Sequence, residues 1–349
     1  MECCKRCGLT FLVCLNVMTL QVVQGLHEPV VAREKTGSRA WGQSVWACSD
    51  MAQASRAEQC AECWPVQGKI TPMLSWFRFF SRWPLWALHA LGALGGWLAW
   101  CFSVRYRRRF LDNVRQAGLG WGTVLRAVGH AGRMSAELPR LWLGATPHFE
   151  WADDRAAVEA YASGQGVLFL TPHMGCFEIT AQALALRFSA QHGPLTVLYR
   201  PARHDGLGEV MSLARQRPGL EAVPTTLAGV RQMIKALRSG RAVGLLPDQV
   251  PPEGMGQWAP FFGKPAYTMT LAARLALQTG ARIVLIWGER LPWGRGYRLH
   301  TQALGHELPA DLDIAVVQIN QAMESLILQC PSQYIWGYAR YKNPRQAPA

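Results

Sequence analysis

Short apolar runs alternate with longer stretches of helical periodicity through the C-terminal two thirds of the chain. The runs typical of buried strands cover residues 166–171, 195–199, 242–246, 282–287 and 297–303. Apolar residues recur at helical spacing over residues 177–188, 227–237, 268–278 and 314–328. The Gly- and Pro-rich stretch 247–265 predicts an irregular connection. Because strands and helices alternate, the pattern predicts an α/β fold, a layered α/β/α domain with a largely parallel sheet.

One stretch is too long and too apolar to belong to this alternation. Residues 83–104 are 22 positions without Asp, Glu, Lys or Arg, which is enough for a helix to span a bilayer. Four tryptophans lie toward its ends, and four arginines, Arg105 and Arg107 to Arg109, follow at once. These features predict one N-terminal transmembrane helix with the large C-terminal part in the cytoplasm. The alternative is a buried helix of a soluble domain, and Gly92 with Gly96 suggests a helix dimer contact.

Composition changes sharply near residue 72. The chain has 349 residues and a net charge of +13, of which only +1 lies up to residue 72 and +12 beyond it. Seven of the ten cysteines also precede Met73. We therefore expect residues 1–72 to be an atypical Cys-rich extension that is signal-like or not translated, with Met73 as the true start. Residues 73–109 would then form the membrane anchor with its basic flank, and residues 110–345 the cytoplasmic domain.

The cysteine spacing leaves one alternative open for the extension. Cys4 with Cys7 and Cys60 with Cys63 are two Cys-x-x-Cys pairs that could form the halves of a zinc site. The long separation between the pairs and the absence of a His pair make this the weaker interpretation.

Overall composition narrows the class of protein. Half of the residues are hydrophobic and 15 are Trp, which excludes a disordered chain. Basic charge combined with this apolarity indicates a protein that acts at a membrane surface, where anionic lipid attracts Lys and Arg. A nucleic-acid binder would explain the charge but not the apolar span, so we expect no nucleic-acid partner.

A histidine and a carboxylate five positions apart follow the first predicted strand. This spacing occurs four times in the chain, but only His173 comes directly after a buried strand, where sites of parallel sheets form. Glu178 falls in the first turns of the next helix, so the two side chains can meet across the intervening turn. A His of this kind takes a proton from a hydroxyl nucleophile, and the carboxylate orients it. The alternative is a buried, hydrogen-bonded turn histidine.

Several ordered blocks carry a resemblance to a known family. They are Thr171-Pro-His-Met-Gly-Cys-Phe-Glu178, Leu198-Tyr-Arg-Pro201, Arg215-Gln-Arg217, Leu245-Leu-Pro-Asp-Gln249, Phe261-Phe-Gly263 and Pro331-Ser-Gln-Tyr-Ile-Trp336 with Arg340-Tyr-Lys342. Together with Asn113 and Glu137, these blocks resemble the bacterial lipid A late acyltransferases of the lysophospholipid acyltransferase superfamily. The resemblance extends from about Met73 to Lys342, and residues 1–72 have no counterpart in it.

The resemblance implies an enzyme that transfers a fatty acyl chain from acyl carrier protein to a hydroxyl of a lipid A precursor. It implies a site on the cytoplasmic side of the bacterial inner membrane, with membrane lipid as a further partner and no cofactor or metal. His173 would be the general base and Glu178 its orienting partner. Arg200, Arg215 and Asp248 would bind substrate, with Asp248 alternatively supporting the His–Glu pair.

Two groups near the motif have other expected roles. Backbone N–H groups near Gly175 are candidates for stabilising the oxyanion of the tetrahedral intermediate. Cys176 is expected to be a small buried residue rather than a nucleophile.

Two rival functions stay open on the sequence. One is an acyltransferase of the same superfamily that acts on another glycolipid or lysophospholipid. The other, from a different class, is a non-catalytic, membrane-anchored lipid-binding protein, which an intact His173 and Glu178 argue against.

Overall fold

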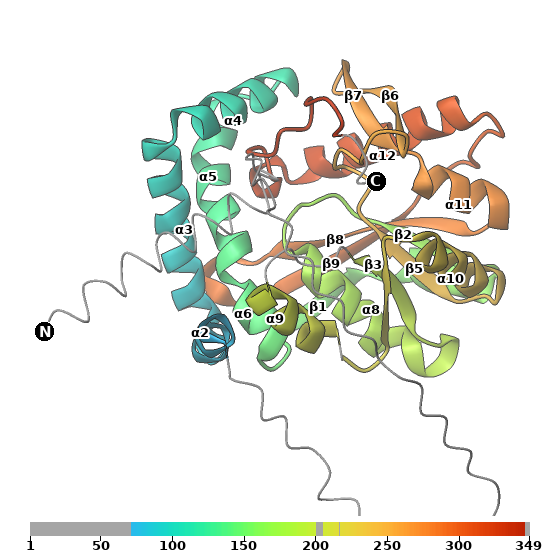
Figure 1. Cartoon of the computed structure of the whole chain (residues 1–349), viewed down its shortest axis with the longest axis horizontal. Helices are drawn as coiled ribbons and strands as arrows, with labels where there is room; N and C mark the ends of the chain where they lie inside the picture. The colour runs from blue at the N-terminus through green and yellow to red at the C-terminus, as the bar shows by residue number, and fades with distance from the viewer. Residues whose placement is uncertain (1–70, 200–204, 216, 346–349) are drawn as a thin grey trace, which may run out of the picture. The chain divides into compact units, whose positions relative to one another are not determined.

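A seven-stranded sheet organises the part of the chain that the structure describes (Figure 1). The computed structural model describes residues 71–199, 205–215 and 217–345. The strands are β1 (Phe149–Asp153), β2 (Val167–Leu170), β3 (Leu195–Tyr199), β4 (Leu220–Pro224), β5 (Ala242–Leu245), β8 (Arg282–Arg290) and β9 (Tyr297–Ala303). Their order is β1-β9-β8-β2-β5-β3-β4, and only β8 and β9 pair antiparallel. The predicted α/β class with a largely parallel sheet is confirmed.

Helices cover both faces of this sheet, because the central strands are apolar on both sides. In β2, Leu168 and Leu170 enter one hydrophobic core, whereas Val167 and Phe169 enter the other. The first core is closed by α10 (Leu227–Arg238), α11 (Leu271–Thr279) and α12 (Leu312–Gln329), and the second by α7 (Arg155–Ala162) and α8 (Phe177–His192). This strict alternation is the period of two that a strand between two helical layers requires.

A group of helices precedes the sheet. It comprises α2 (Pro72–Ser81), α3 (Leu85–Phe102), α4 (Val104–Gln116), α5 (Trp121–Ala136) and α6 (Leu138–Leu143). A further helix, α9 (Asp205–Arg215), packs with α2 and α6. Helix α2 begins at Pro72. The Thr71 hydroxyl accepts a hydrogen bond from the Leu74 N–H, and Pro72 occupies the first turn, as helix starts favour.

The predictions for residues 1–72 concern segments that lie almost wholly outside the described residues. Only Thr71 and Pro72 of that extension are described, and the two Cys-x-x-Cys pairs are not. The start at Met73 and the zinc alternative therefore stay predictions.

Helix α3 is the one helix among the described residues that is long and apolar enough to cross a membrane, judged by length and composition. It lies inside the predicted span 83–104 and is consistent with a single transmembrane helix. Its outward face carries exposed apolar side chains, including Trp86 and Leu94. Arg107 donates hydrogen bonds to the carbonyls of Trp100 and Cys101, which satisfies backbone groups left free at the end of the helix.

The inward face of α3 packs closely on α5. An added Cβ at Gly92 or Gly132 would collide with the backbone of the other helix, so both positions need glycine. A Cβ added at Gly96 would likewise collide with the carbonyl of Val128. The glycine pair that suggested a dimer contact is therefore occupied within the chain, and that expectation is wrong.

The stretch 247–265, predicted to be an irregular connection, contains most of a β-hairpin. Strands β6 (Gly256–Phe261) and β7 (Lys264–Met269) pair antiparallel around the two-residue turn Phe262-Gly263. Both turn residues have positive φ, at 47° and 74°, as tight hairpin turns require. The start of the helix expected from residue 268 is therefore the end of β7. Strands β1 and β4 were also not anticipated, since each is short and only half-buried.

Candidate active site

His173 and Asp248 occupy equivalent places after two neighbouring parallel strands. Leu170 of β2 is paired with Leu245 of β5, and each is the last residue of its strand. His173 and Asp248 each follow three residues later, so the register of the strands brings them to the same carboxyl edge of the sheet. This is the edge at which parallel sheets form their sites.

Two hydrogen bonds join these residues. Asp248 Oδ1 lies 2.7 Å from His173 Nδ1, and Asp248 Oδ2 accepts the backbone N–H of His173 at 2.9 Å. Burial alone would raise the pKa of the Asp248 carboxyl, but the charge and hydrogen bonds of His173 outweigh burial and hold that pKa below its ordinary value. An ionised carboxylate only accepts, so Nδ1 carries a proton, and in the neutral form of the ring Nε2 is then the nitrogen with the lone pair. The arrangement presents a base oriented by a buried carboxylate.

Two residues of the C-terminal block 331–342 lie near Asp248. Tyr334 and Arg340 are both buried, and the positive charge of Arg340 contributes to the lowered pKa of Asp248. Arg340 donates to the carbonyl of Tyr267 and to Thr268 Oγ1, each at 2.7 Å. These bonds fix the guanidinium beside the hairpin, so it acts on Asp248 as a charge at fixed position.

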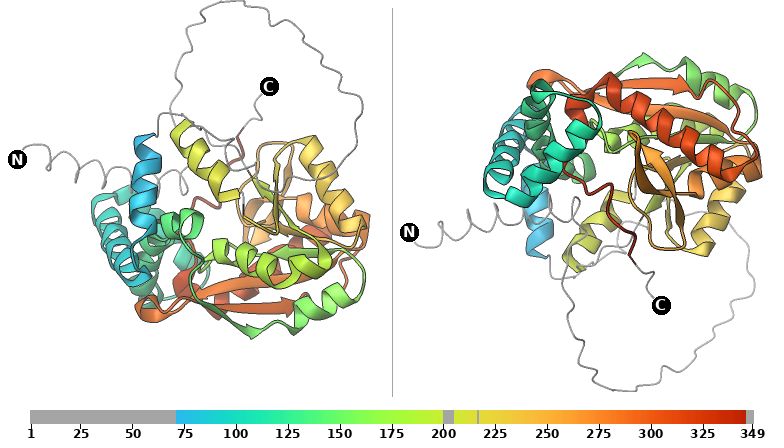
Figure 2. Two further views of the ribbon diagram at one scale, coloured as in Figure 1. Left: turned by 90° about the horizontal axis from the view of Figure 1, so that it is seen from below. Right: turned by 90° about the horizontal axis from the view of Figure 1, so that it is seen from above.

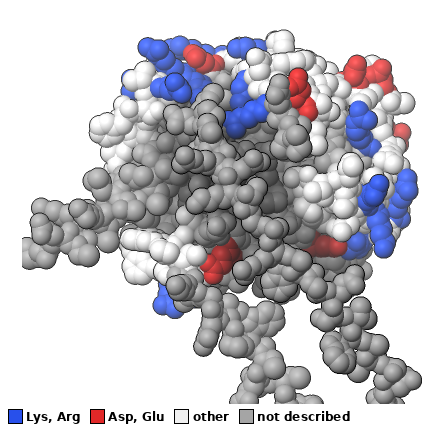
Figure 3. All heavy atoms as spheres, viewed as in Figure 1, with Lys and Arg blue, Asp and Glu red and all other residues white. Residues whose placement is uncertain are grey.

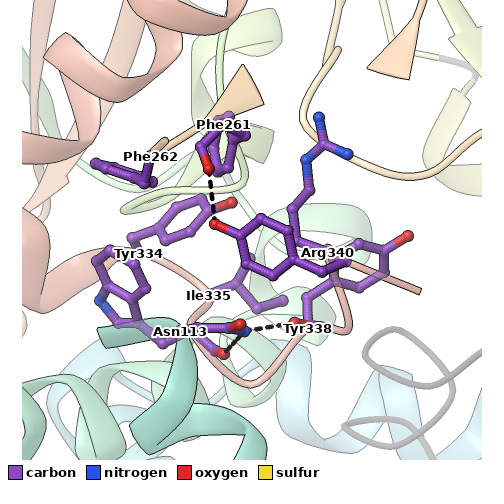
Figure 4. A pocket seen from close by; sticks show the side chains of 9 residues that line it. Asn113, Phe261, Phe262, Tyr334, Ile335, Tyr338 and Arg340 are labelled. Atoms are coloured by element: carbon purple, nitrogen blue, oxygen red, sulfur yellow. Dashed lines mark hydrogen bonds between the residues drawn. The ribbon is translucent and has the colours of Figure 1, made fainter. Parts of the chain in front are cut away.

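The same block packs tightly against α4 (Figure 4). Asn113 donates hydrogen bonds to the carbonyls of Trp336 and Tyr338, and the Tyr341 hydroxyl donates to the carbonyl of Phe261. The cavity among these side chains measures about 10 Å³, which is about one water molecule. It is therefore a packing defect and not a binding site for a lipid.

The turn that carries His173 has no free backbone donor. The N–H groups of residues 173–176 donate, in order, to Asp248 Oδ2 and to the carbonyls of Pro172, Gln333 and Gly288, at 2.9, 2.7, 2.9 and 2.8 Å. These four N–H groups already have acceptors, so the oxyanion stabiliser expected near Gly175 is not one of them. Burial also raises the pKa of the Cys176 thiol well above its ordinary value, which removes this cysteine as a nucleophile, as expected.

A buried ion pair between Arg290 and Glu137 is hydrogen-bonded to this turn. Arg290 is 2% exposed and Glu137 is 1% exposed. The Arg290 guanidinium donates to both carboxylate oxygens of Glu137, at 2.6 and 2.9 Å, and also to the carbonyl of Gly175 at 2.8 Å. Gly175 has a φ of +55°, and an added Cβ would strike the carbonyl of Gly288. Arg290 thus fixes a turn whose backbone conformation and close approach require glycine at position 175.

Glu137 accepts two further hydrogen bonds besides those from Arg290. His89 of α3 and the Tyr297 hydroxyl donate to Glu137 Oε2, at 3.0 and 2.9 Å. Burial would raise the pKa of Glu137, but Arg290 outweighs burial and lowers it to about 2. His130 Nδ1 accepts from Arg290 at 3.1 Å, and burial, with help from Arg290, lowers the pKa of His130 to about 3. One polar network therefore connects α3 to the turn of His173.

Glu178 does not hold the position at His173 Nδ1 that the sequence predicts for an orienting carboxylate. That position belongs to Asp248. Glu178 is half-buried in the first turn of α8. Burial lowers the pKa of Arg217, and the negative charge of Glu178 partly offsets this effect. Arg217 in turn donates to the carbonyls of Leu141 and Gly144.

Two predicted substrate-binding residues are beyond what the structure describes. Arg200 lies outside the described residues, and Arg215 ends α9 without a described side chain. Conversely, sequence reasoning missed Arg290 and Gln333. Both touch the turn of His173 from more than a hundred residues away, and no local spacing announces such a contact.

Comparisons with known proteins identify a family and several relatives. Residues 124–343 match the family described as bacterial lipid A biosynthesis acyltransferase. The lipid A biosynthesis palmitoleoyltransferase of Escherichia coli (strain K12) is 26% identical over 185 residues, which are 53% of this chain and 58% of that protein. The lipid A biosynthesis lauroyltransferase of the same organism is 27% identical over 194 residues, which are 55% and 61%.

A third relative gives a similar match. The lipid A biosynthesis acyltransferase of Haemophilus influenzae is 25% identical over 184 residues, which are 51% of this chain and 54% of that protein. The chain thus spans less than two thirds of the length of each of these relatives.

Proposed function

Because the chain belongs to the bacterial lipid A biosynthesis acyltransferase family, we propose that it transfers a fatty acyl chain to a hydroxyl of a lipid A precursor. The observation that carries this proposal is the hydrogen-bonded pair of His173 and Asp248 at the carboxyl edge of the sheet. A neutral histidine with Nδ1–H directed to a carboxylate has the form that a general base for a hydroxyl nucleophile needs.

The reaction balances with one histidine. His173 Nε2 takes the proton of the acceptor hydroxyl while the oxygen attacks the thioester carbonyl and forms the new ester bond. The carbon–sulfur bond then breaks, and the imidazolium returns the proton to the departing thiolate. Asp248 keeps the imidazole in the required tautomer and stabilises the transient positive charge. No covalent acyl-enzyme is needed, in keeping with the buried Cys176.

Glu178 has a positioning role in this proposal, different from that of Asp248. It lies at the start of α8, the helix that follows the His173 turn, and it adds a negative charge to the same edge of the sheet. We assign Glu178 to the positioning of His173 or of the acceptor. Arg200 and Arg215 would bind the acceptor, since their cations suit a phosphorylated sugar, and Asp248 would orient His173.

The donor in this proposal is acyl carrier protein, and the enzyme works at the cytoplasmic side of the inner membrane. Support for the membrane comes from the apolar outward face of α3 and the basic residues that follow it. Arg105, Arg108 and Arg115 of α4 are exposed directly after the apolar helix. Cations at that place favour the cytoplasmic side and attract anionic lipid headgroups.

The proposal is tested by acyl transfer with the full chain extracted from membranes. A panel of acyl carrier protein thioesters would be offered with a tetra-acylated lipid A precursor, and His173→Ala would be the matched inactive variant. Transfer by the wild type that disappears in His173→Ala supports the proposal, and the panel identifies the preferred chain. Folded protein that transfers only to lysophospholipids or other glycolipids would overturn the lipid A acceptor, and transfer that survives in His173→Ala would overturn the base.

A further inference from the structure

A basic surface lies on the far side of the molecule from α3. Arg231, Lys235 and Arg238 are spaced four and three residues apart on α10, so they form one stripe along the helix. All three are exposed, and they line a hollow of about 560 Å³ with Ile234 and, from α11, Gln278. Figure 3 shows Lys and Arg gathered over this side, separately from the group over α4.

The cations of this surface have no acidic partners. Neither α10 nor α11 contains an Asp or Glu, and in the part of the chain that the structure describes no ion pair includes Arg231, Lys235 or Arg238. Exposed arginines elsewhere are different: Arg155, Arg187 and Arg298 each pair with a neighbouring carboxylate. The stripe therefore keeps its full charge available to a ligand.

The position of this basic stripe favours a soluble partner over a lipid surface. Figures 1 and 2 place α10 and α11 on the side of the domain opposite α3, the helix suited to the membrane. A membrane that holds α3 would leave the α10 surface turned toward solution. The arginines of α4, by contrast, adjoin α3 and are placed for lipid headgroups.

The stripe also leads to the catalytic edge. Helix α10 begins three residues after β4 ends, at the edge of the sheet where His173 and Asp248 lie. At 1.5 Å per residue, Arg231 lies about 6 Å and Arg238 about 16 Å along the helix from its start. A carrier docked there would need a long flexible arm to bring its thioester to His173, and a carrier protein holds its acyl chain on such an arm.

From these observations we infer that the surface formed by Arg231, Lys235 and Arg238 docks a soluble, acidic acyl carrier protein. The inference rests on the proposed function, since it names the surface that receives the donor. The apolar side chain of Ile234 between the cations suits the amphipathic face of an acidic helix. Charge complementarity of this kind speeds encounter and fixes the orientation of the partner.

The experiment measures binding of fluorescently labelled acyl carrier protein to the full chain in detergent, by anisotropy. The test variant is Arg231→Gln/Lys235→Gln/Arg238→Gln. The control, Arg155→Gln/Arg187→Gln/Arg298→Gln, removes the same number of positive charges from the opposite end of the sheet order, where surface ion pairs contribute little to stability. Melting temperatures of all three proteins would show that each is folded.

We expect the test variant to bind the carrier about ten-fold more weakly than wild type at low salt, with a shallower dependence on ionic strength. The control variant should bind within about two-fold of wild type. If the triple variant unfolds, the pair Lys235→Gln/Arg238→Gln gives the same comparison with a smaller loss.

Three results would overturn the inference. They are equal weakening by both variants, unchanged carrier binding by the test variant, and loss of binding to anionic phospholipid vesicles with carrier binding intact. A wild-type protein that binds the carrier through this stripe yet transfers no acyl chain would contradict the proposed function and leave the docking surface standing.

Discussion

Asp248 Oδ1 lies 2.7 Å from His173 Nδ1, and its other oxygen accepts the backbone N–H of the same histidine. One carboxylate thus fixes both the ring and the main chain of the proposed base. Since Asp248 is 1% exposed, water cannot replace either contact. The orientation of His173 therefore depends on a residue 75 positions away.

The first prediction concerns this pair. Asp248→Asn leaves one acceptor oxygen for the two donors of His173 and removes the negative charge, so the Nδ1–H tautomer is no longer selected and kcat should fall by about 10³-fold or more, while the fold is retained. Glu178→Gln is the matched amide variant at the other carboxylate and should cost less, because Glu178 does not bond to Nδ1. Steady-state acyl transfer by the purified variants gives the comparison. A larger loss in Glu178→Gln than in Asp248→Asn would return the orienting role to Glu178.

A second prediction addresses the buried ion pair. Glu137→Gln should destabilise the protein by about 3–5 kcal/mol, because Arg290 then keeps a buried charge without its counter-ion. Denaturant unfolding followed by tryptophan fluorescence measures this change. The double variant Glu137→Met/Arg290→Met should be more stable than the sum of the two single changes, since neither charge is stranded. Strict additivity would show that the two groups do not depend on each other.

Acid sensitivity provides a third prediction. The pKa of His130 is lowered from 6.5 to about 3 in the folded protein, so between these values the unfolded chain binds a proton that the folded chain does not. Stability should therefore fall as pH drops below 6.5, by up to about 1.4 kcal/mol per pH unit from this residue. Glu137, with a pKa of about 2, adds a loss of the same sign below about pH 4.5.

The measurement for this prediction is the melting temperature between pH 4 and 8, recorded for the wild type and for His130→Gln. Glutamine keeps an acceptor for Arg290 but cannot take a proton, so the variant should show a flatter profile above pH 4.5. Identical profiles would mean that His130 does not supply the acid sensitivity.

A fourth prediction tests the close contact of α3 and α5. Gly132→Ala places a methyl group against the carbonyl of Gly92, so the two helices must separate and stability should fall by a few kcal/mol. Gly122→Ala is the control on the same helix. A Cβ at Gly122 meets nothing within 4 Å, and alanine there should stabilise the helix slightly. Thermal unfolding of both variants would contradict the packing if Gly132→Ala were neutral.

The sheet and the proposed base were predictable because both follow from local pattern. Apolar runs located β2, β3, β5 and β9 to within about a residue, and the position of His173 after a buried strand identified it among nine histidines. The pairing with Asp248 was within reach of the same reasoning, since both residues follow their strands by three positions. Spacing along the chain favoured the nearer carboxylate, Glu178, because such spacing does not include strand register.

The support of the site was not predictable in this way. Arg290 ends an ordinary apolar strand, and its partners Glu137 and Gly175 are 153 and 115 residues away. A buried charge can be recognised only when its counter-ion is known to be near, and that knowledge requires the fold. The β6–β7 hairpin was missed for a related reason, because Pro and Gly in its strands suggested a loop.

The position of His89 has a practical consequence for anyone preparing a soluble form of this protein. Removing the apolar N-terminal helix is the usual way to avoid detergent. Here that truncation would also delete one of the donors to Glu137 and expose to water the face of α5 that packs against Gly92 and Gly96. Glu137 and Arg290 together fix the turn of His173. A shortened protein can therefore be soluble and monodisperse while the turn that carries the proposed base is less ordered. Low activity in such a preparation would then report the loss of α3 and not the absence of the chemistry.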